Sequence, residues 1–173
     1  MSNACSKKSG FTLVEALVVV AIMGILSGIG VASLRSAVAN SRIKDAGINV
    51  TAFMQRAANE ATRLNEKLCV VASGKSIKTY KGECNSTGDQ IDAMELESAN
   101  AFVSSKNCPD GVTRYNDNKV TLTPKIGVSP IPSGCFVIQY GSTDRYAASI
   151  KATTKFSMYY KLSYDSGSSW FEF

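Results

Sequence analysis

The stretch that decides the fold reads KKSGFTLVEALVVVAIMGILSGIGVAS and covers residues 7–33. From Ala16 to Leu34, 19 consecutive positions carry no charged residue. A helix rises about 1.5 Å per residue, so this run is about 28 Å long, close to the hydrocarbon thickness of a bilayer. The sequence therefore predicts that residues 11–34 form a helix that can span a membrane.

The residues before the apolar run predict its orientation. Lys7 and Lys8 precede it, and the positive-inside tendency keeps such an N-terminus in the cytoplasm. The rest of the chain then lies on the far side of the membrane. A secretory signal peptide is the alternative for a basic-then-apolar N-terminus, but this run is longer than a usual signal core and no Ala-x-Ala site ends it.

One acidic residue, Glu15, interrupts the apolar pattern. A carboxylate at the edge of an apolar span costs a few kcal/mol unless something satisfies it. Either Glu15 lies at the membrane interface and reaches water, or it awaits a cation. If the chain were cut after Gly10, Phe11 would carry a new amino group, and this group on a neighbouring copy would be a natural partner.

The order KKSG, then FTLVE, then an unbroken apolar run resembles the class III signal of type IV prepilins and type II secretion pseudopilins. The resemblance implies that a prepilin peptidase cuts between Gly10 and Phe11 and methylates the amino group of Phe11. It also implies that Glu15 is the assembly residue. Many major pilins kink this helix with a proline where the present chain has Ala32. Glycines in the span, which weaken a helix by up to about 1 kcal/mol each, offer flexibility instead.

The same resemblance implies a structural subunit of a type IV pilus or type II secretion pseudopilus, not an enzyme. From the residues themselves, no cofactor or metal is expected. Its partners would be the prepilin peptidase, other pilins or pseudopilins, the inner-membrane assembly platform and the membrane. The protein would cross the bacterial inner membrane once, with a periplasmic C-terminal domain, before it enters the fibre. The expected domains are a leader (1–10), a transmembrane half-helix (11–34), an amphipathic half-helix (35–66) and a β-rich domain (67–173).

Composition excludes several chemistries. The chain has 173 residues, a net charge of +5 and no histidine. Histidine-dependent metal sites and Ser-His-Asp or Cys-His catalysis are therefore excluded. Removal of Lys7 and Lys8 with the leader lowers the net charge from +5 to +3, an excess too small by itself to imply nucleic acid.

Four of the five cysteines lie beyond the apolar run: Cys69, Cys84, Cys108 and Cys135. An even number in an oxidising compartment indicates two disulfides. Three pairings are possible, and the shortest loops favour Cys69–Cys84 and Cys108–Cys135, each worth about 3 kcal/mol in the chain-entropy model. Free buried thiols are the alternative. The spacings of 15, 24 and 27 residues do not suit a four-cysteine zinc site.

Beyond Leu34 the sequence stays helical in pattern but becomes amphipathic, which favours one helix from Phe11 to about Asn65. Its apolar stripe contains Ala46, Val50, Phe53, Ala57, Ala61, Leu64 and Leu68. This stripe is expected to pack on the globular domain, and the part before Ala46 on lipid and later on other subunits. On the polar side, Arg56 and Glu60 are spaced for an i,i+4 ion pair.

From residue 67 onward the period changes to two. Strands are expected at 68–72, 76–80, 120–123, 135–140, 150–153, 156–164 and 170–173, the strand at 156–164 with one buried face. Residues 93–103 form either a short helix or a strand with a loop. The fold class is therefore α+β, a long helix packed on an antiparallel sheet. By its layout the domain is similar to minor pilins and pseudopilins of the GspH/FimT type.

For three further motifs, an ordinary structural explanation is better supported than a functional one. Gly74-Lys75-Ser76 ends like a phosphate loop but lacks the glycine five positions earlier. Asp89, Asp92, Glu95 and Glu97 lack EF-hand spacing, so a solvated face is favoured over calcium. The third motif is a group of aromatic and lysine residues near the C-terminus: Tyr146, Tyr159, Tyr160, Tyr164, Trp170, Lys151, Lys155 and Lys161. These residues could form a stacking surface for nucleic acid. Their alternation favours core positions and cross-strand pairs instead.

Two other classes of function remain open at this stage. An anchored subunit could present its aromatic and lysine face to DNA or to a substrate, as a binding minor pilin at a fibre tip. A plain single-pass membrane protein would keep Met1 and would not assemble.

Overall fold

The computed structural model describes residues 10–85, 88–96, 101–103, 108–111, 113–124, 134–141, 146–152, 158–163 and 169–172. The elements are α1 (Leu13–Leu64), β1 (Leu68–Ser73), β2 (Ser76–Lys81), β3 (Gln90–Glu95), β4 (Ala101–Val103), β5 (Lys119–Leu122), β6 (Phe136–Tyr140), β7 (Tyr146–Ala152), β8 (Met158–Ser163) and β9 (Phe171–Glu172). Two short 3-10 helices, Pro109–Gly111 and Asn116–Asn118, precede β5. The α+β class, with one long N-terminal helix and antiparallel sheets, is confirmed.

The chain divides into two compact units, residues 1–38 and residues 39–173. The first holds the apolar part of α1. The second holds the remaining turns of α1 and every strand of the described residues.

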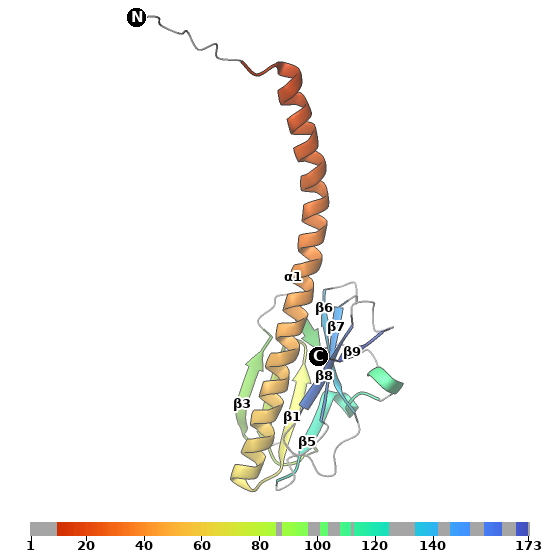
Figure 1. Ribbon diagram of the computed structural model, residues 1–173. Helices are drawn as coiled ribbons and strands as arrows, with labels where there is room; N and C mark the ends of the chain where they lie inside the picture. Colours follow the sequence, from red (N-terminus) through yellow and green to blue (C-terminus); the bar gives the residue numbers. More distant parts are fainter. Residues whose placement is uncertain are drawn as a thin grey trace, which may run out of the picture. The chain divides into compact units, whose positions relative to one another are not determined.

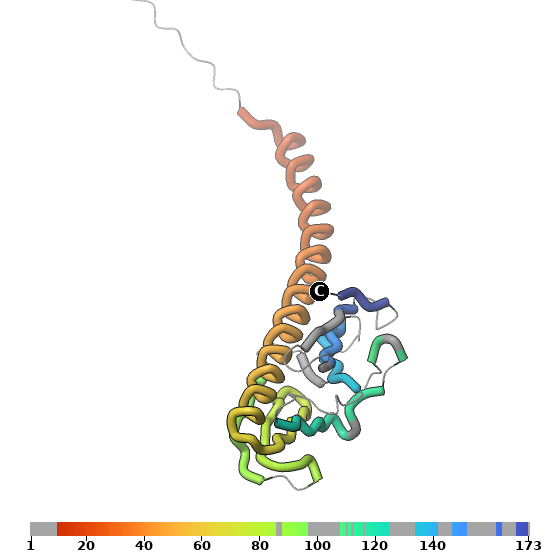
Figure 2. The backbone as a smooth tube through the Cα atoms, turned by 60° about the horizontal axis from the view of Figure 1, so that its bottom comes forward, coloured from red at the N-terminus to blue at the C-terminus, as the bar shows by residue number. Residues whose placement is uncertain are grey.

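The C-terminal end of α1 is closed by its own backbone. Asn65 adopts a left-handed conformation with φ of 52°. Its N–H donates to the Thr62 carbonyl at 3.3 Å, and the Glu66 N–H donates to the Ala61 carbonyl at 3.2 Å. These two bonds form a Schellman motif, in which asparagine takes the position that glycine usually occupies. The chain then reverses into β1 (Figure 2). Leu68, which the sequence placed both at the end of the helical stripe and in a strand at 68–72, lies in the strand.

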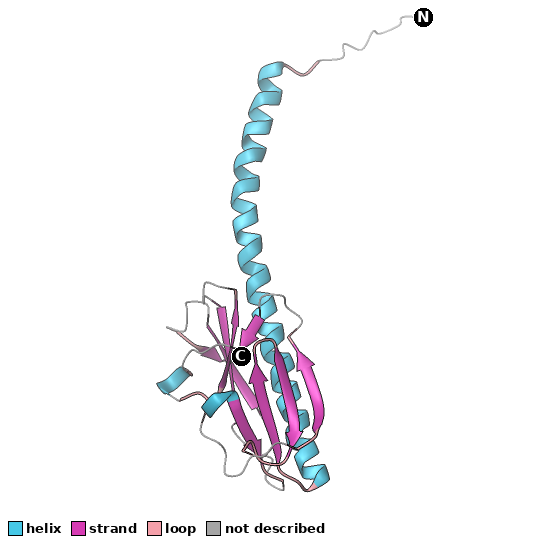
Figure 3. Ribbon diagram, turned by 180° about the vertical axis from the view of Figure 1, so that it is seen from behind, coloured by secondary structure: helices cyan, strands magenta, loops and turns pink. Residues whose placement is uncertain are grey.

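The strands form two antiparallel sheets rather than the single sheet that the sequence predicted. One has the order β3-β2-β1-β5 and the other the order β4-β6-β7-β8-β9 (Figures 1 and 3). The ambiguous segment 93–103 explains the difference, because its first residues end β3 and its last residues form β4. β3 pairs with β2 in the first sheet, whereas β4 pairs with β6 in the second.

The core lies between the amphipathic turns of α1 and one face of each sheet. Ile43, Val50 and Phe53 are fully buried, together with β-strand residues such as Leu68 and Phe136. Burial begins at Ala39, about two turns before Ala46. The expectation that the stripe before Ala46 packs on lipid and other subunits is therefore wrong for Ala39 and Ile43, which belong to the protein's own core.

The paired strands β6 and β7 of the second sheet are buried on both faces at the described positions. Phe136 and Ile138 face the main core, while Val137 and Ala147 face a smaller cluster with Cys108 and Cys135. The neighbouring β8 residues Leu162 and Ser163 are 1% and 0% exposed, although the alternating pattern at 156–164 predicted only one buried face. A layer that includes Cys108 and Trp170 covers the second face, which strand periodicity cannot reveal.

One glycine in this layer is required by its neighbour. Gly134 has φ of +147°, and a Cβ at this position would lie 2.6 Å from the Tyr115 ring. The ring of Tyr115 packs edge-on against Phe136 with a centroid distance of 4.8 Å. Any side chain at position 134 would therefore displace an aromatic pair of the core.

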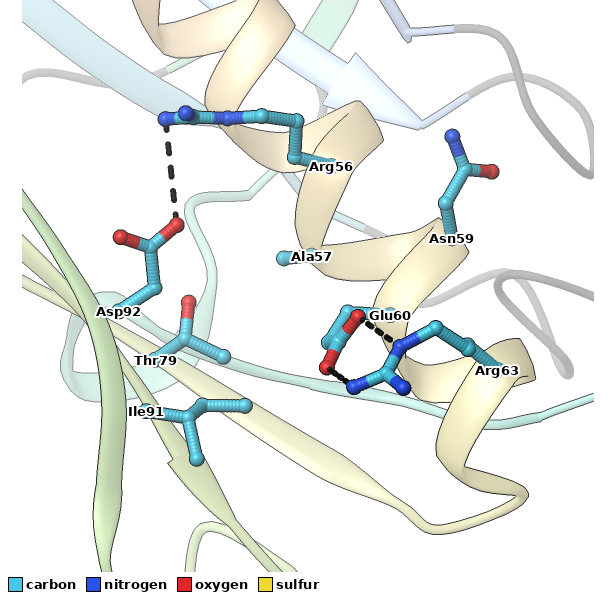
Figure 4. Close-up of a pocket in the computed structure, with 8 residues that line it drawn as sticks. All are labelled: Arg56, Ala57, Asn59, Glu60, Arg63, Thr79, Ile91 and Asp92. Atoms are coloured by element: carbon cyan, nitrogen blue, oxygen red, sulfur yellow. Dashed lines mark hydrogen bonds and ion pairs between the residues drawn. The ribbon is translucent and has the colours of Figure 1, made fainter.

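The expected Arg56–Glu60 ion pair is not formed. Glu60 instead accepts two hydrogen bonds from Arg63, one turn further on, at 2.7 Å and 2.5 Å. This bidentate geometry holds the pKa of the Glu60 carboxyl below its ordinary value, chiefly through the hydrogen bonds. Arg56 lies beside β3 and pairs with Asp92 at 3.9 Å (Figure 4). Contact with a strand distant in sequence thus replaces the local pair.

Candidate processing and assembly site

The predicted cleavage site lies just before the first turn of α1. Gly10 and Phe11 have no regular secondary structure, and both are exposed. The Phe11 side chain is 79% exposed, and no described atom lies within 4 Å of the Cβ position at Gly10. The Gly10–Phe11 peptide bond is therefore accessible, as a proteolytic site requires.

Thr12 and Glu15 together cap the N-terminus of α1. The Glu15 N–H donates to Thr12 Oγ1 at 3.3 Å. In return, the Thr12 N–H and hydroxyl both lie 3.5 Å from Glu15 Oε2. This is the reciprocal arrangement of a capping box, in which threonine is the N-cap and glutamate the third helical residue.

This capping box was not among the features expected from the sequence. Its signal was present as Thr12-x-x-Glu15 directly before an apolar run, the usual signature of a helix start. The arrangement gives Glu15 a structural function within its own chain. At the same time, a first-turn carboxylate interacts favourably with the helix dipole.

The Glu15 carboxylate nevertheless has capacity for a further partner. Its bonds to Thr12 are 3.5 Å long, at the weak limit for hydrogen bonds. A carboxylate offers about four acceptor positions, and no ion pair with Glu15 occurs among the described residues. The geometry therefore leaves an exposed, negatively charged group available to a cation from another molecule.

The apolar part of α1 has no cover of its own. Leu17, Ile25 and Ile29 are each more than 60% exposed, and no residue of the most apolar window is buried. The positions of Gly24 and Gly28 are also open. By length and composition α1 can cross a membrane. Together with the motif below, this helix indicates a single-pass, membrane-anchored protein.

The four cysteines that were expected to form disulfides lie in two pairs. Cys69 and Cys84 have a Cα–Cα distance of 5.0 Å, and Cys108 and Cys135 one of 6.0 Å, and each pair is bonded. The first pair attaches β1 to the segment after β2, where the Cys84 N–H lies 3.4 Å from Thr121 Oγ1. The second lies in the smaller buried cluster.

The remaining motifs do not assemble into a site within the described residues. Gly74 and Lys75 form the turn between β1 and β2, so no helix follows them as in a phosphate loop. No group of three or more potential metal ligands occurs in the described part of the chain. Asp92 and Glu95 belong to β3, whereas Glu97 lies outside the described residues.

The described members of the proposed stacking group lie mainly on the paired strands β7 and β8. Tyr146 begins β7, and Tyr159 and Tyr160 lie in β8, while Tyr164 and Lys155 lie outside the described residues. Trp170 is partly buried against the Cys108–Cys135 cluster, in agreement with the alternative of core packing. Lys151 in β7 is opposite Tyr159, and Lys161 is in β8.

The comparison with protein families agrees with the N-terminal geometry. Residues 5–31 match the prokaryotic N-terminal methylation motif. No curated protein matches the chain, and no solved structure does. The matched residues contain Gly10, Phe11 and Glu15, so the chain carries the N-terminal signal of a type IV prepilin-like or pseudopilin-like protein.

Proposed function

We propose that this protein is a minor structural subunit of a type IV pilus or type II secretion pseudopilus. It is processed between Gly10 and Phe11, methylated on the amino group of Phe11, and assembled through α1. The observation that supports this function best is the methylation motif over residues 5–31, which coincides with an exposed peptide bond and an exposed first-turn carboxylate.

Processing supplies the charge that the site lacks. Cleavage creates an ammonium group on Phe11, and methylation leaves that group positively charged. In a bundle of apolar helices the carboxylate of Glu15 is costly without a partner. The Phe11 terminus of a neighbouring subunit neutralises it, and the exposed apolar side chains of residues 13–34 then pack together in the fibre.

The rest of the chain suits an outward-facing domain. The leader (1–10) stays cytoplasmic, residues 11–34 span the inner membrane, residues 35–66 continue the helix, and the β-rich domain (67–173) lies in the periplasm. The two disulfides are suited to that oxidising compartment. A β domain built mainly on hairpins supports a minor subunit of the GspH/FimT type. The prepilin peptidase, other pilins or pseudopilins and the inner-membrane assembly platform are the proposed partners.

Mass spectrometry of the protein from cells tests the processing step. We expect a mature chain that begins with methylated Phe11, and only the uncut chain when Gly10→Val replaces the residue before the bond. Normal cleavage of that variant, or a wild-type protein that retains the leader, would contradict the proposal.

A second experiment tests assembly separately. Glu15→Gln should be cleaved and inserted normally, yet enter fibres at least about tenfold less than wild type because the buried charge pair is lost. Glu60→Gln removes a carboxylate from the same helix outside the apolar segment and serves as the matched control. Equal incorporation of all three proteins would rule out the assembly function of Glu15.

A further inference from the structure

The open edge of β3 differs in charge from the rest of the molecule. Residues 82–105 contain five acidic residues and no lysine or arginine, although the chain as a whole has 19 basic and 14 acidic residues. Three of these acids, Asp89, Asp92 and Glu95, lie on β3 or directly before it. The negative charge is thus concentrated along one strand.

Among the described strands, β3 pairs only with β2, and it is the outermost strand of its sheet (Figure 1). The Leu96 N–H points toward β2, because it donates to the Lys75 carbonyl at 2.8 Å. Since amide directions alternate along a strand, the N–H groups of Ala93 and Glu95 point outward. Gln90, Ala93 and Glu95 are exposed. β3 therefore presents main-chain groups to a further strand.

The side chain of Asp92 occupies part of this edge. Asp92 Oδ1 accepts the outward N–H of Ala93 at 2.8 Å, and its Oδ2 lies 3.9 Å from Arg56. For the Glu95 amide no acceptor occurs within the described residues. A carboxylate at a sheet edge repels acidic strands and is costly to bury against apolar ones. An incoming strand with a cationic side chain can pair with the Asp92 carboxylate and thereby free the Ala93 N–H. The position of Asp92 therefore favours cationic strands over acidic or apolar ones.

A groove adjoins β3 on the side that α1 covers. Its volume is about 360 Å³, and its walls include Ala57 and Glu60 from α1, Thr79 from β2, and Ile91 and Asp92 from β3 (Figure 4). Thr79 is 1% exposed, and its hydroxyl has no hydrogen-bond partner among the residues that the structure describes. In Figure 4 this hydroxyl points toward the gap between Arg56 and Asp92. The groove thus contains an unsatisfied polar group beneath a long, exposed ion pair.

We infer that the edge of β3 is a docking site for an extended, lysine- or arginine-rich segment of a partner polypeptide. Its main chain adds a strand beside β3. A cationic side chain on the α1 face meets Asp92 at the mouth of the groove above Thr79, and the alternate side chains lie on the opposite face, beside Glu95. This site goes beyond membrane anchoring and fibre assembly and does not depend on them.

Binding of two synthetic peptides to the full chain in non-ionic detergent micelles tests the inference. The probes are nine-residue peptides of alternating lysine and valine, or of alternating glutamate and valine, with affinity measured by fluorescence anisotropy. We expect the lysine peptide to bind at least about tenfold more tightly, with an affinity that falls as salt rises. It should also protect the Glu95 amide from hydrogen exchange. Equal affinities, or protection elsewhere, would overturn the assignment.

A matched pair of variants at Ala93 separates strand pairing from simple charge attraction. Ala93→Pro removes an outward N–H without removing a bond to β2, and edge strands tolerate proline; Ala93→Val keeps the N–H. We expect Ala93→Pro to weaken the lysine peptide about tenfold and Ala93→Val less than about twofold. Equal binding by the two variants would refute strand addition.

A second copy of the chain is the alternative occupant of this edge. Protection of the Glu95 amide that increases with protein concentration in the absence of peptide would identify that second copy as the occupant and overturn the inference.

Discussion

Both halves of α1 are helical, but the apolar side chains of the first half are exposed and those of the second half are largely buried. In residues 13–38 the large apolar side chains are exposed, with Leu17 at 63% and Ile25 at 66%. In residues 39–64 a stripe of the same helix is covered, and Ile43, Val50 and Phe53 are fully buried. The first half has apolar residues on every side, whereas the second alternates them with polar residues at helical spacing.

The difference shows that one helix can serve two separate stabilising environments. The amphipathic half buries its stripe in the chain's own core, so its stability is that of the β domain. The apolar half has no such core, and a helix that is apolar on all sides needs lipid or other helices. Substitutions in the two halves should therefore affect different properties of the protein.

The largest expected effect comes from Phe53. Phe53→Ala should lower the free energy of unfolding of the β domain by about 3–5 kcal/mol, because it leaves a cavity at a fully buried position. Leu17→Ala should leave that free energy unchanged. Urea unfolding of the full chain in detergent, followed by the fluorescence of the single tryptophan, Trp170, measures both. An equal loss of stability in the two variants would show that the halves are not energetically separate.

A smaller and local effect is expected at the other end of the helix. Thr12→Val removes the capping hydroxyl that Glu15 uses and should destabilise the first turn by about 1 kcal/mol. Hydrogen exchange at the amides of Leu13 to Glu15 should accelerate about fivefold, with urea unfolding of the β domain unchanged. Thr12→Ser, which keeps the hydroxyl, should behave like wild type. Unchanged exchange in Thr12→Val would show that the capping box does not hold this turn.

The smallest effect concerns a surface pair in the amphipathic half. Because the hydrogen bonds and charge of Arg63 hold the pKa of Glu60 below its ordinary value, the pair stabilises the folded state above that ordinary value. The contribution is lost as the pH falls through the lowered folded pKa. NMR titration of the carboxyl should show the pKa of Glu60 rising in Arg63→Met. Lys67→Met, which removes the cation that pairs with Glu83, should leave it unchanged.

Patterns within short segments predicted the helix and most of the strands, because these elements depend mainly on neighbouring residues. The uninterrupted apolar run and the helical spacing beyond it predicted one helix from Phe11 to about Asn65, and the structure has Leu13–Leu64. Alternation placed strands near β1, β2, β5, β6 and β8. The segment at 93–103 remained ambiguous because β3 has little apolar alternation and β4 has only three residues.

The candidate site shows the same division. The order of residues around Gly10, Phe11 and Glu15 was sufficient to predict the methylation motif that matches residues 5–31, because this motif is a short linear segment. The capping bonds of Thr12 were also encoded locally, although the sequence analysis did not use that signal. The pairing of Arg56 with Asp92 was not encoded locally. Asp92 is 36 positions further along the chain and approaches Arg56 only when β3 packs beside α1.

The amino-acid sequence by itself determined the long helix, its apolar N-terminal half and the methylation motif, because each depends on residues within a few turns of one another. Only the tertiary structure decided that burial begins at Ala39, that the described strands divide into two sheets, and that both faces of β6 and β7 are covered. Those properties depend on contacts between segments distant in the chain, and periodicity within one segment carries no information about which other segment will cover it.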